Sequence, residues 1–234
     1  MQMTEEIDAI MFDAGGTLIE VRPPREKVFS RVLAKHGGRT EPKRIAALLA
    51  RADGRFDSEF AKLDGKNEAA FWSRYDDFVL DELRFKGDRK RFTKDLGETW
   101  DNIIPKVESW IDFPEVKSIL QTLKKREFKL GVVSNATDLA RKVFDNLDLS
   151  KYFDFMILSE EVGVRKPSPK IFHLAAAVAG SSPSRSLFVG DKLAVDVIGA
   201  KKTGMNAVLV DRVNAYPEAK CIREKNLNFF RRFA

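Results

Sequence analysis

The chain opens with a short apolar segment and then changes to a helical pattern. Residues 7–12 are mostly apolar, which is typical of a short buried strand. From about Arg25 to Ile104, apolar residues recur at helical spacing and predict four helices, the second of them broken near Gly54. The four apolar groups are Val28, Phe29, Val32 and Leu33; Ile45, Leu48, Leu49, Phe56 and Phe60; Phe71, Trp72, Tyr75, Phe78, Val79 and Leu83; and Phe92, Leu96, Trp100 and Ile103.

After Pro114 the predicted helices and strands alternate. Helices are expected up to residue 126, over 139–147 and 171–179, and up to 202; strands are expected up to 133 and 189 and over 155–158 and 207–210. Such alternation is typical of right-handed crossovers between the strands of a parallel sheet. Residues 220–234 predict a short strand and a closing helix. We therefore predict an α/β protein with a Rossmann-like three-layer core of residues 1–21 and 106–234, interrupted by a helical bundle of residues 22–105.

Composition and charge narrow the class of protein. A hydrophobic content of 44% over 234 residues is enough for a sizeable core. The net charge of +6 comes from basic residues interleaved with acidic ones, as in residues 84–91, which favours solvated helix surface over a nucleic-acid site. No segment approaches the roughly 20 apolar residues of a membrane span, and the first residues lack a signal-peptide layout.

Cys221 is the only cysteine, which excludes an internal disulfide and a cysteine-cluster metal site. A chain without these features fits a reducing compartment. We expect a soluble cytoplasmic protein that binds neither nucleic acid nor membrane; its oligomeric state stays open.

Polar residues follow several of the predicted strands. Because the carboxyl ends of parallel strands share one sheet edge, where ligands bind, these residues should converge. Gly15 and Gly16, which follow Asp13 closely, let the backbone approach a ligand. Taken singly, each residue has an ordinary explanation, such as a helix cap or a surface lysine; the ordered set indicates a site. Its members are Asp13, Ser134, Asn135, Lys166, Asp191 and Asp196.

These motifs resemble, in order and spacing, those of the haloacid dehalogenase-like hydrolases, and the resemblance covers nearly the whole chain. It implies a helical cap over the sheet edge and a phosphatase that forms an aspartyl-phosphate on Asp13. Two carboxylates, Asp13 and Asp191, would repel each other without a cation, and Mg²⁺ suits oxygen ligands. By resemblance, the backbone carbonyl of Gly15 is the third protein ligand. The expected substrate is a small phosphorylated metabolite, because a capped site excludes bulky polymers.

The resemblance assigns roles to the remaining residues. Lys166 would offset negative charge, and the side chains of Thr17, Ser134 and Asn135 would bind the phosphate oxygens. Asp196 would orient Lys166 or a metal-bound water without binding the metal itself.

The sequence departs from the family pattern at Gly15. Phosphatases of this family carry a second aspartate there, which protonates the leaving oxygen and then activates water. His36 and His173 lie on predicted helices and are expected to be structural.

Three alternatives stay open at this point. A 2-haloacid dehalogenase would act on a halogenated substrate without metal and could hold the substrate carboxylate through Arg44 or Arg51. A phosphonoacetaldehyde hydrolase would use a cap lysine, for which Lys27, Lys35 and Lys62 are candidates. A non-catalytic binding protein could also use the same scaffold.

Overall fold

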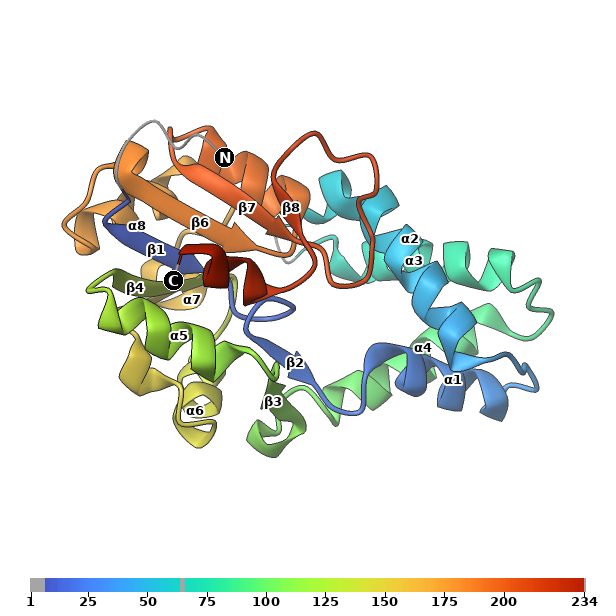
Figure 1. The fold of residues 1–234 in the computed structure, drawn as a ribbon. Helices are drawn as coiled ribbons and strands as arrows, with labels where there is room; N and C mark the ends of the chain where they lie inside the picture. Colours follow the sequence, from blue (N-terminus) through green and yellow to red (C-terminus); the bar gives the residue numbers. More distant parts are fainter. Residues whose placement is uncertain (1–6, 64–65, 234) are drawn as a thin grey trace.

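The structure, a computed structural model, describes residues 7–63 and 66–233. Its core is a six-stranded parallel sheet with the strand order β5-β4-β1-β6-β7-β8 (Figure 1). β1 lies between β4 and β6, so that the carboxyl ends of these three strands lie side by side. The strands are β1 Ala9–Phe12, β4 Lys129–Ser134, β5 Phe155–Leu158, β6 Ser186–Gly190, β7 Asn206–Val210 and β8 Arg223–Glu224.

Helices cover both faces of the sheet, as the alternating side chains of the central strand require. Ile10 and Phe12 of β1 pack into one hydrophobic cluster, and Ala9 and Met11 pack into the other. The first cluster is completed by α5 Val116–Lys125, α6 Leu139–Asn146 and the terminal segment η5 Leu227–Phe233; the second by α8 Pro169–Val178, the π-helical segment η4 Leu193–Ile198 and α9 Gly199–Lys201. Short connections are η2 Ser150–Tyr152, α7 Ser159–Val162 and η3 Pro183–Arg185. The predicted three-layer α/β fold is confirmed.

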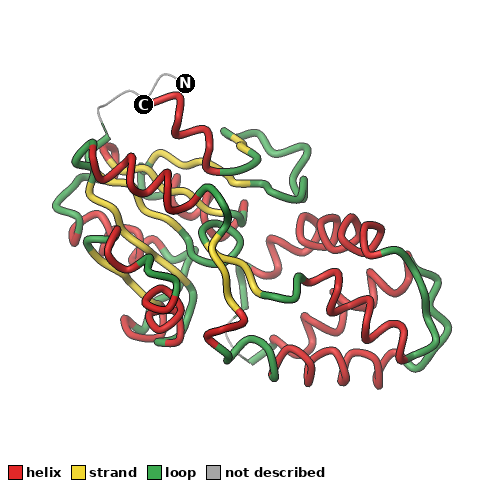
Figure 2. The backbone as a smooth tube through the Cα atoms, turned by 60° about the horizontal axis from the view of Figure 1, so that its bottom comes forward, coloured by secondary structure: helices red, strands yellow, loops and turns green. Residues whose placement is uncertain are grey.

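Four helices separate from the sheet and form a bundle with its own core, which we call the helical insertion (Figure 2). The insertion is joined to the sheet by a small antiparallel pair of strands, β2 Ile19–Val21 and β3 Trp110–Asp112, preceded by the 3-10 turn η1 Val107–Ser109. Its helices are α1 Arg25–Lys35, α2 Pro42–Phe60, α3 Glu68–Glu82 and α4 Arg89–Asp101. The four predicted helices are present; division of the chain at residues 22 and 105 stays a prediction.

The expected break of the second helix at Gly54 is wrong, because α2 is continuous from Pro42 to Phe60. A Cβ atom at Gly54 would overlap with the backbone oxygen of Ala215. The glycine therefore serves close approach of α2 to the core rather than a helix break. One turn further on, the carboxylate of Asp57 accepts hydrogen bonds from Ala194 N at 2.6 Å and from the Tyr216 hydroxyl at 2.9 Å. These contacts fasten the insertion to the sheet domain.

The strands β2 and β3 were not predicted, since a strand of three residues is too short to show a clear pattern of apolar and polar positions.

Asp76 in α3 makes the stability of the insertion depend on pH. Its side chain is buried, and burial raises its pKa from 3.8 to about 7. Between these pH values the unfolded chain releases a proton that the folded chain keeps, so stability falls as pH rises from about 4 to 7. Asp76→Asn should therefore raise the free energy of unfolding by on the order of 1–3 kcal/mol at pH 8 and change it little at pH 4. Urea denaturation at both pH values measures the free energy of unfolding of the wild type and the variant. Asp101→Asn, at the exposed end of α4, is the control and should not show this pH dependence. Equal free energies of unfolding for Asp76→Asn and the wild type at pH 8 would contradict the prediction.

Candidate active site

Asp13 lies at the end of β1, where its backbone N–H donates to Val189 O of β6 at 2.9 Å. The side chain is buried, with 8% of the residue exposed. Lys166 Nζ donates to Asp13 Oδ1 at 2.6 Å, and the Ser134 hydroxyl lies 3.4 Å from the same oxygen. Burial raises the pKa of Asp13, and the adjacent ammonium opposes that shift. The structure thus brings Asp13, Ser134 and Lys166 together from segments far apart in the sequence.

Lys166 is fixed from several sides. Its Nζ also donates to Asp196 Oδ1 at 2.7 Å, and the other oxygen of Asp196 accepts from Lys192 N at 3.0 Å. The side-chain amide of Asn135 donates to Lys166 O at 2.8 Å and accepts from Lys166 N at 2.7 Å. Both polar atoms of Asn135 are therefore engaged with the backbone of Lys166. This geometry makes Asn135 a support for the lysine, and its role in binding phosphate stays a prediction.

The turn after Asp13 is held by an arginine that the sequence did not reveal. Arg212, two residues after β7, donates to Gly16 O at 3.1 Å and to Thr17 O at 2.7 Å. Its guanidinium pairs with Glu115 at 2.8 Å and stacks 3.5 Å above the Phe113 ring. An arginine close after a strand was the only available signal, and charge alone could not distinguish it from surface arginines.

Close approach of the backbone explains one glycine of this turn. Gly16 has φ +80°, and a Cβ atom there would overlap with the Asp191 carboxylate. Thr17 is fully buried, and its hydroxyl has no hydrogen-bond partner among the described residues. A buried hydroxyl without a partner is a donor that a bound oxyanion could use.

Three carboxylates form a cluster that fits a divalent cation. Asp13, Asp191 and Asp196 each offer an oxygen within 4.8 Å of the others. Burial raises the pKa of Asp191 to about 7, and the neighbouring carboxylates add to the shift against the opposing effect of Lys192. Because both oxygens of Asp196 accept hydrogen bonds from protein groups, Asp13 and Asp191 are the better ligands. An all-oxygen donor set with excess negative charge suits Mg²⁺.

A cavity of about 330 Å³ lies between the sheet edge and the helical insertion. Gly15, Gly16 and Asp191 line it from the sheet side, and Arg25 and Asp53 from the insertion. Asp13, Ser134 and Lys166 are buried beside this cavity and are not among its lining residues. A Cβ atom at Gly15 would meet nothing within 4 Å, so the cavity has room for a side chain there.

The residues proposed for the alternative reactions lie elsewhere. Arg51 forms a double hydrogen bond with the Glu82 carboxylate, and Arg44 donates to the Glu82 backbone oxygen. Neither arginine lines the cavity, and the exposed lysines at positions 27, 35 and 62 do not line it either. His36 pairs with Asp95 at 2.9 Å within the insertion.

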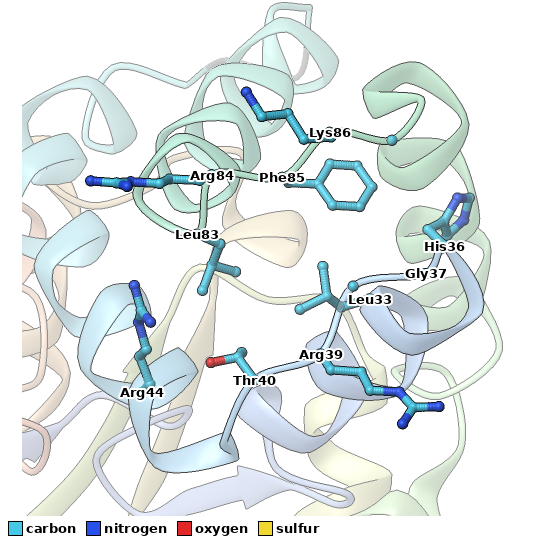
Figure 3. A pocket seen from close by; sticks show the side chains of 12 residues that line it. Leu33, His36, Gly37, Arg39, Thr40, Arg44, Leu83, Arg84, Phe85 and Lys86 are labelled. Carbon is cyan, nitrogen blue, oxygen red and sulfur yellow. The ribbon is translucent and has the colours of Figure 1, made fainter.

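A second hollow, of about 310 Å³, lies at the end of the insertion that points away from the sheet (Figure 3). Leu33, Thr40 and Leu83 face it, whereas the Arg39 side chain points away. Its twelve lining residues include no carboxylate. The hollow therefore lacks the nucleophile and metal ligands of a phosphoryl-transfer site.

Comparison with known proteins identifies the class. A family model of the haloacid dehalogenase-like hydrolases matches residues 7–204, and the chain belongs to this family. A glyceraldehyde 3-phosphate phosphatase of Methanothermobacter thermautotrophicus is 38% identical over 100 residues, which cover 42% of this chain and 44% of that relative. The match thus spans less than half the length of the curated relative.

Solved structures show the same fold without deciding the reaction. The crystal structure of a HAD phosphatase from Thermococcus onnurineus has a TM-score of 0.59 at 23% identity and covers 97% of both chains. A dehalogenase structure has a TM-score of 0.61 at 20% identity and covers 98% of both chains. Among the described residues, no helix is both long and apolar enough to cross a membrane.

Proposed function

We propose that the protein is an Mg²⁺-dependent phosphatase that hydrolyses a small phosphorylated metabolite through an aspartyl-phosphate on Asp13. The observation that carries this proposal is the pairing of Asp13 with Lys166 at 2.6 Å beside the Asp191 carboxylate. The carboxylates of Asp13 and Asp191 lie close enough to share a cation, which a phosphatase would use and a dehalogenase would not need. The phosphatase relative of Methanothermobacter thermautotrophicus supports the same reaction class.

Each residue of the cluster contributes a defined step. The Asp13 carboxylate attacks phosphorus, the bond from phosphorus to the ester oxygen breaks, and the alcohol leaves. Lys166 and the hydroxyls of Thr17 and Ser134 offset the charge of the phosphoryl oxygens. A water molecule then attacks the phosphorus of the aspartyl-phosphate and the bond from phosphorus to the Asp13 oxygen breaks. Inorganic phosphate and a proton are released to solvent, and the Asp13 carboxylate is regenerated. Mg²⁺, held by Asp13, Asp191 and the Gly15 carbonyl, would neutralise the carboxylates and polarise the phosphoryl oxygens.

The leaving oxygen has no protein acid beside it at position 15. Asp53 lines the cavity, and although burial opposes it, Lys192 and Arg25 hold the pKa of Asp53 at about 2. Burial raises the pKa of Tyr75, which donates to Asp53. Neither residue supplies a proton at neutral pH. We infer that water protonates the leaving group, which slows the hydrolysis of esters with strongly basic alcohols.

Removal of the metal separates the proposed function from its alternatives. A panel of small phosphate monoesters should be hydrolysed with Mg²⁺, and excess EDTA should lower the rate by about 10²-fold or more, because the cation contributes several kcal/mol to the barrier. Phosphate release is the measurement, and added Mg²⁺ should restore it. Halide release from 2-haloacids in EDTA would instead favour the dehalogenase. Absence of both activities would favour a binding protein.

A further inference from the structure

Lys192 presents a charged group without a hydrogen bond inside the cavity. It directly follows Asp191 and lines both the 330 Å³ cavity and a neighbouring one of about 170 Å³. Its Nζ forms ion pairs with Asp191 Oδ2 at 3.6 Å and with Asp53 Oδ1 at 3.8 Å, and both distances are longer than a hydrogen bond. Within residues 7–63 and 66–233, nothing accepts a hydrogen bond from this ammonium, which carries three donors. Its side chain is 24% exposed and lines both cavities, so its three N–H donors are open to a ligand that binds there.

Arg25 lies in the same two cavities and is held rigidly. It donates to both oxygens of Asp53, at 3.1 and 2.6 Å, and the Tyr75 hydroxyl donates to Asp53 at 2.8 Å. These partners satisfy Asp53 and leave other N–H groups of the guanidinium free. In the proposed function Asp191 is engaged with the metal, so neither nearby carboxylate compensates Lys192 fully.

The other carboxylates that line the larger cavity are few. Glu20 is held by Arg22 at 2.7 Å, Glu26 stands in the first turn of α1, and Asp211 pairs with Arg223. None of them forms an ion pair with Lys192 or Arg25. With Asp191 engaged by the metal, Asp53 is the one carboxylate among the described lining residues that pairs with Lys192 and Arg25, and these two cations exceed its charge. This excess of positive charge on the insertion side favours an anionic group, separate from the phosphate that the Asp13 cluster would hold.

We propose that Lys192, together with the anchored Arg25, binds a carboxylate of the substrate, so that the substrates are phosphorylated carboxylic acids of a few carbon atoms. The size limit follows from the volume of about 330 Å³, at the lower end of small-molecule sites. Aromatic side chains, among them Phe56, Phe60 and Trp72, form a wall of the neighbouring cavity, and the centre of the Phe60 ring lies 5.9 Å from Lys192 Nζ. This inference rests on the proposed phosphatase function.

The test compares two esters that differ in the carboxylate. Phosphoglycolate carries a carboxylate where ethyl phosphate carries a methyl group. The wild-type protein should hydrolyse phosphoglycolate with a kcat/KM at least about ten-fold higher, since a charge-assisted hydrogen bond contributes about this much. Lys192→Met should lower the ratio of the two kcat/KM values about ten-fold, mainly through the KM of phosphoglycolate. Lys192→Arg should retain most of the ratio, and Lys90→Met on the exposed surface of α4 should not alter it.

A binding measurement separates failure of this inference from failure of the proposed function. Phosphonoacetate and ethylphosphonate differ in the same way and cannot be hydrolysed at an ester bond. In calorimetry with Mg²⁺, the wild type should bind phosphonoacetate about ten-fold more tightly than ethylphosphonate. Lys192→Met should bind the two phosphonates with equal affinity. If neither ester is hydrolysed but the wild type still prefers phosphonoacetate and Lys192→Met does not, the proposed phosphatase function is wrong and the proposed carboxylate site is supported. Equal binding of both phosphonates, or a preference that survives Lys192→Met, overturns the site.

Discussion

Replacement of Asp13 by asparagine is expected to lower the turnover of every phosphate monoester by on the order of 10⁴-fold or more, while the protein stays folded. An amide preserves the shape of the carboxylate but is a poor nucleophile and a poor ligand for a cation. Lys166 keeps its second partner, Asp196, at 2.7 Å, so the buried ammonium is not left unpaired. Phosphate release and thermal unfolding, measured on the same preparation, test both parts of this expectation.

A covalent intermediate gives this prediction a second measurement. Acid quenching of the wild-type protein during turnover of a ³²P-labelled ester should trap label on the chain, and the Asp13→Asn variant should trap none. Asp101→Asn, which changes an exposed carboxylate at the end of α4, should trap label as the wild type does. Retained activity of Asp13→Asn with unaltered unfolding would refute the nucleophilic role of Asp13.

Gly15→Asp is expected to increase the hydrolysis of alkyl phosphates by about ten-fold or more, because general acid catalysis typically contributes 10²- to 10⁴-fold. The cavity has space for the new side chain, since a Cβ atom at Gly15 would meet nothing within 4 Å. Aryl phosphates have better leaving groups and should gain less. The deciding quantity is the ratio of alkyl to aryl rates at saturating Mg²⁺, in the variant and in the wild type.

Gly15→Asn is the matched control, because it adds a side chain of the same size without an acidic proton. It should leave the alkyl-to-aryl ratio at the wild-type value. If Gly15→Asp also leaves the ratio unchanged, leaving-group protonation does not limit the wild-type reaction. A fall in both rates for both variants would show instead that the cavity needs the space at position 15 for its substrate.

The sequence predicted the fold class well, because the alternation of helices and strands along the chain follows from the spacing of apolar residues. Sheet topology then brought Asp13, Ser134, Lys166 and Asp191 to one edge, although their roles stay predictions. Features that depend on atomic contacts were beyond the sequence. The break expected at Gly54 was wrong, since the pattern cannot distinguish a glycine that ends a helix from one that lies against another backbone.

Gly15 and Asp191 were predicted and line the cavity, but other lining residues were beyond prediction. Arg44 and Arg51 were as plausible as any arginine of the insertion, yet Arg25 is the one that reaches the cavity. Lys192 stood beside a predicted ligand and was not singled out, because the direction of its side chain depends on how α2 packs. Only the distances to Asp53 and Asp191 reveal its position.

The segment that follows β7 serves both parts of the molecule. Arg212 holds the backbone that follows Asp13. Ala215 contacts α2 at Gly54, and Tyr216 donates a hydrogen bond to Asp57 of the same helix. The same helix carries Asp53 into the cavity. A chimera that exchanges the helical insertion for that of another family member would thus pack a foreign helix against Ala215 and Tyr216, which would not match its surface. Such a chimera would have to exchange residues 211–216 as well, so we expect this loop and the helical insertion to change together, both in evolution and in engineering.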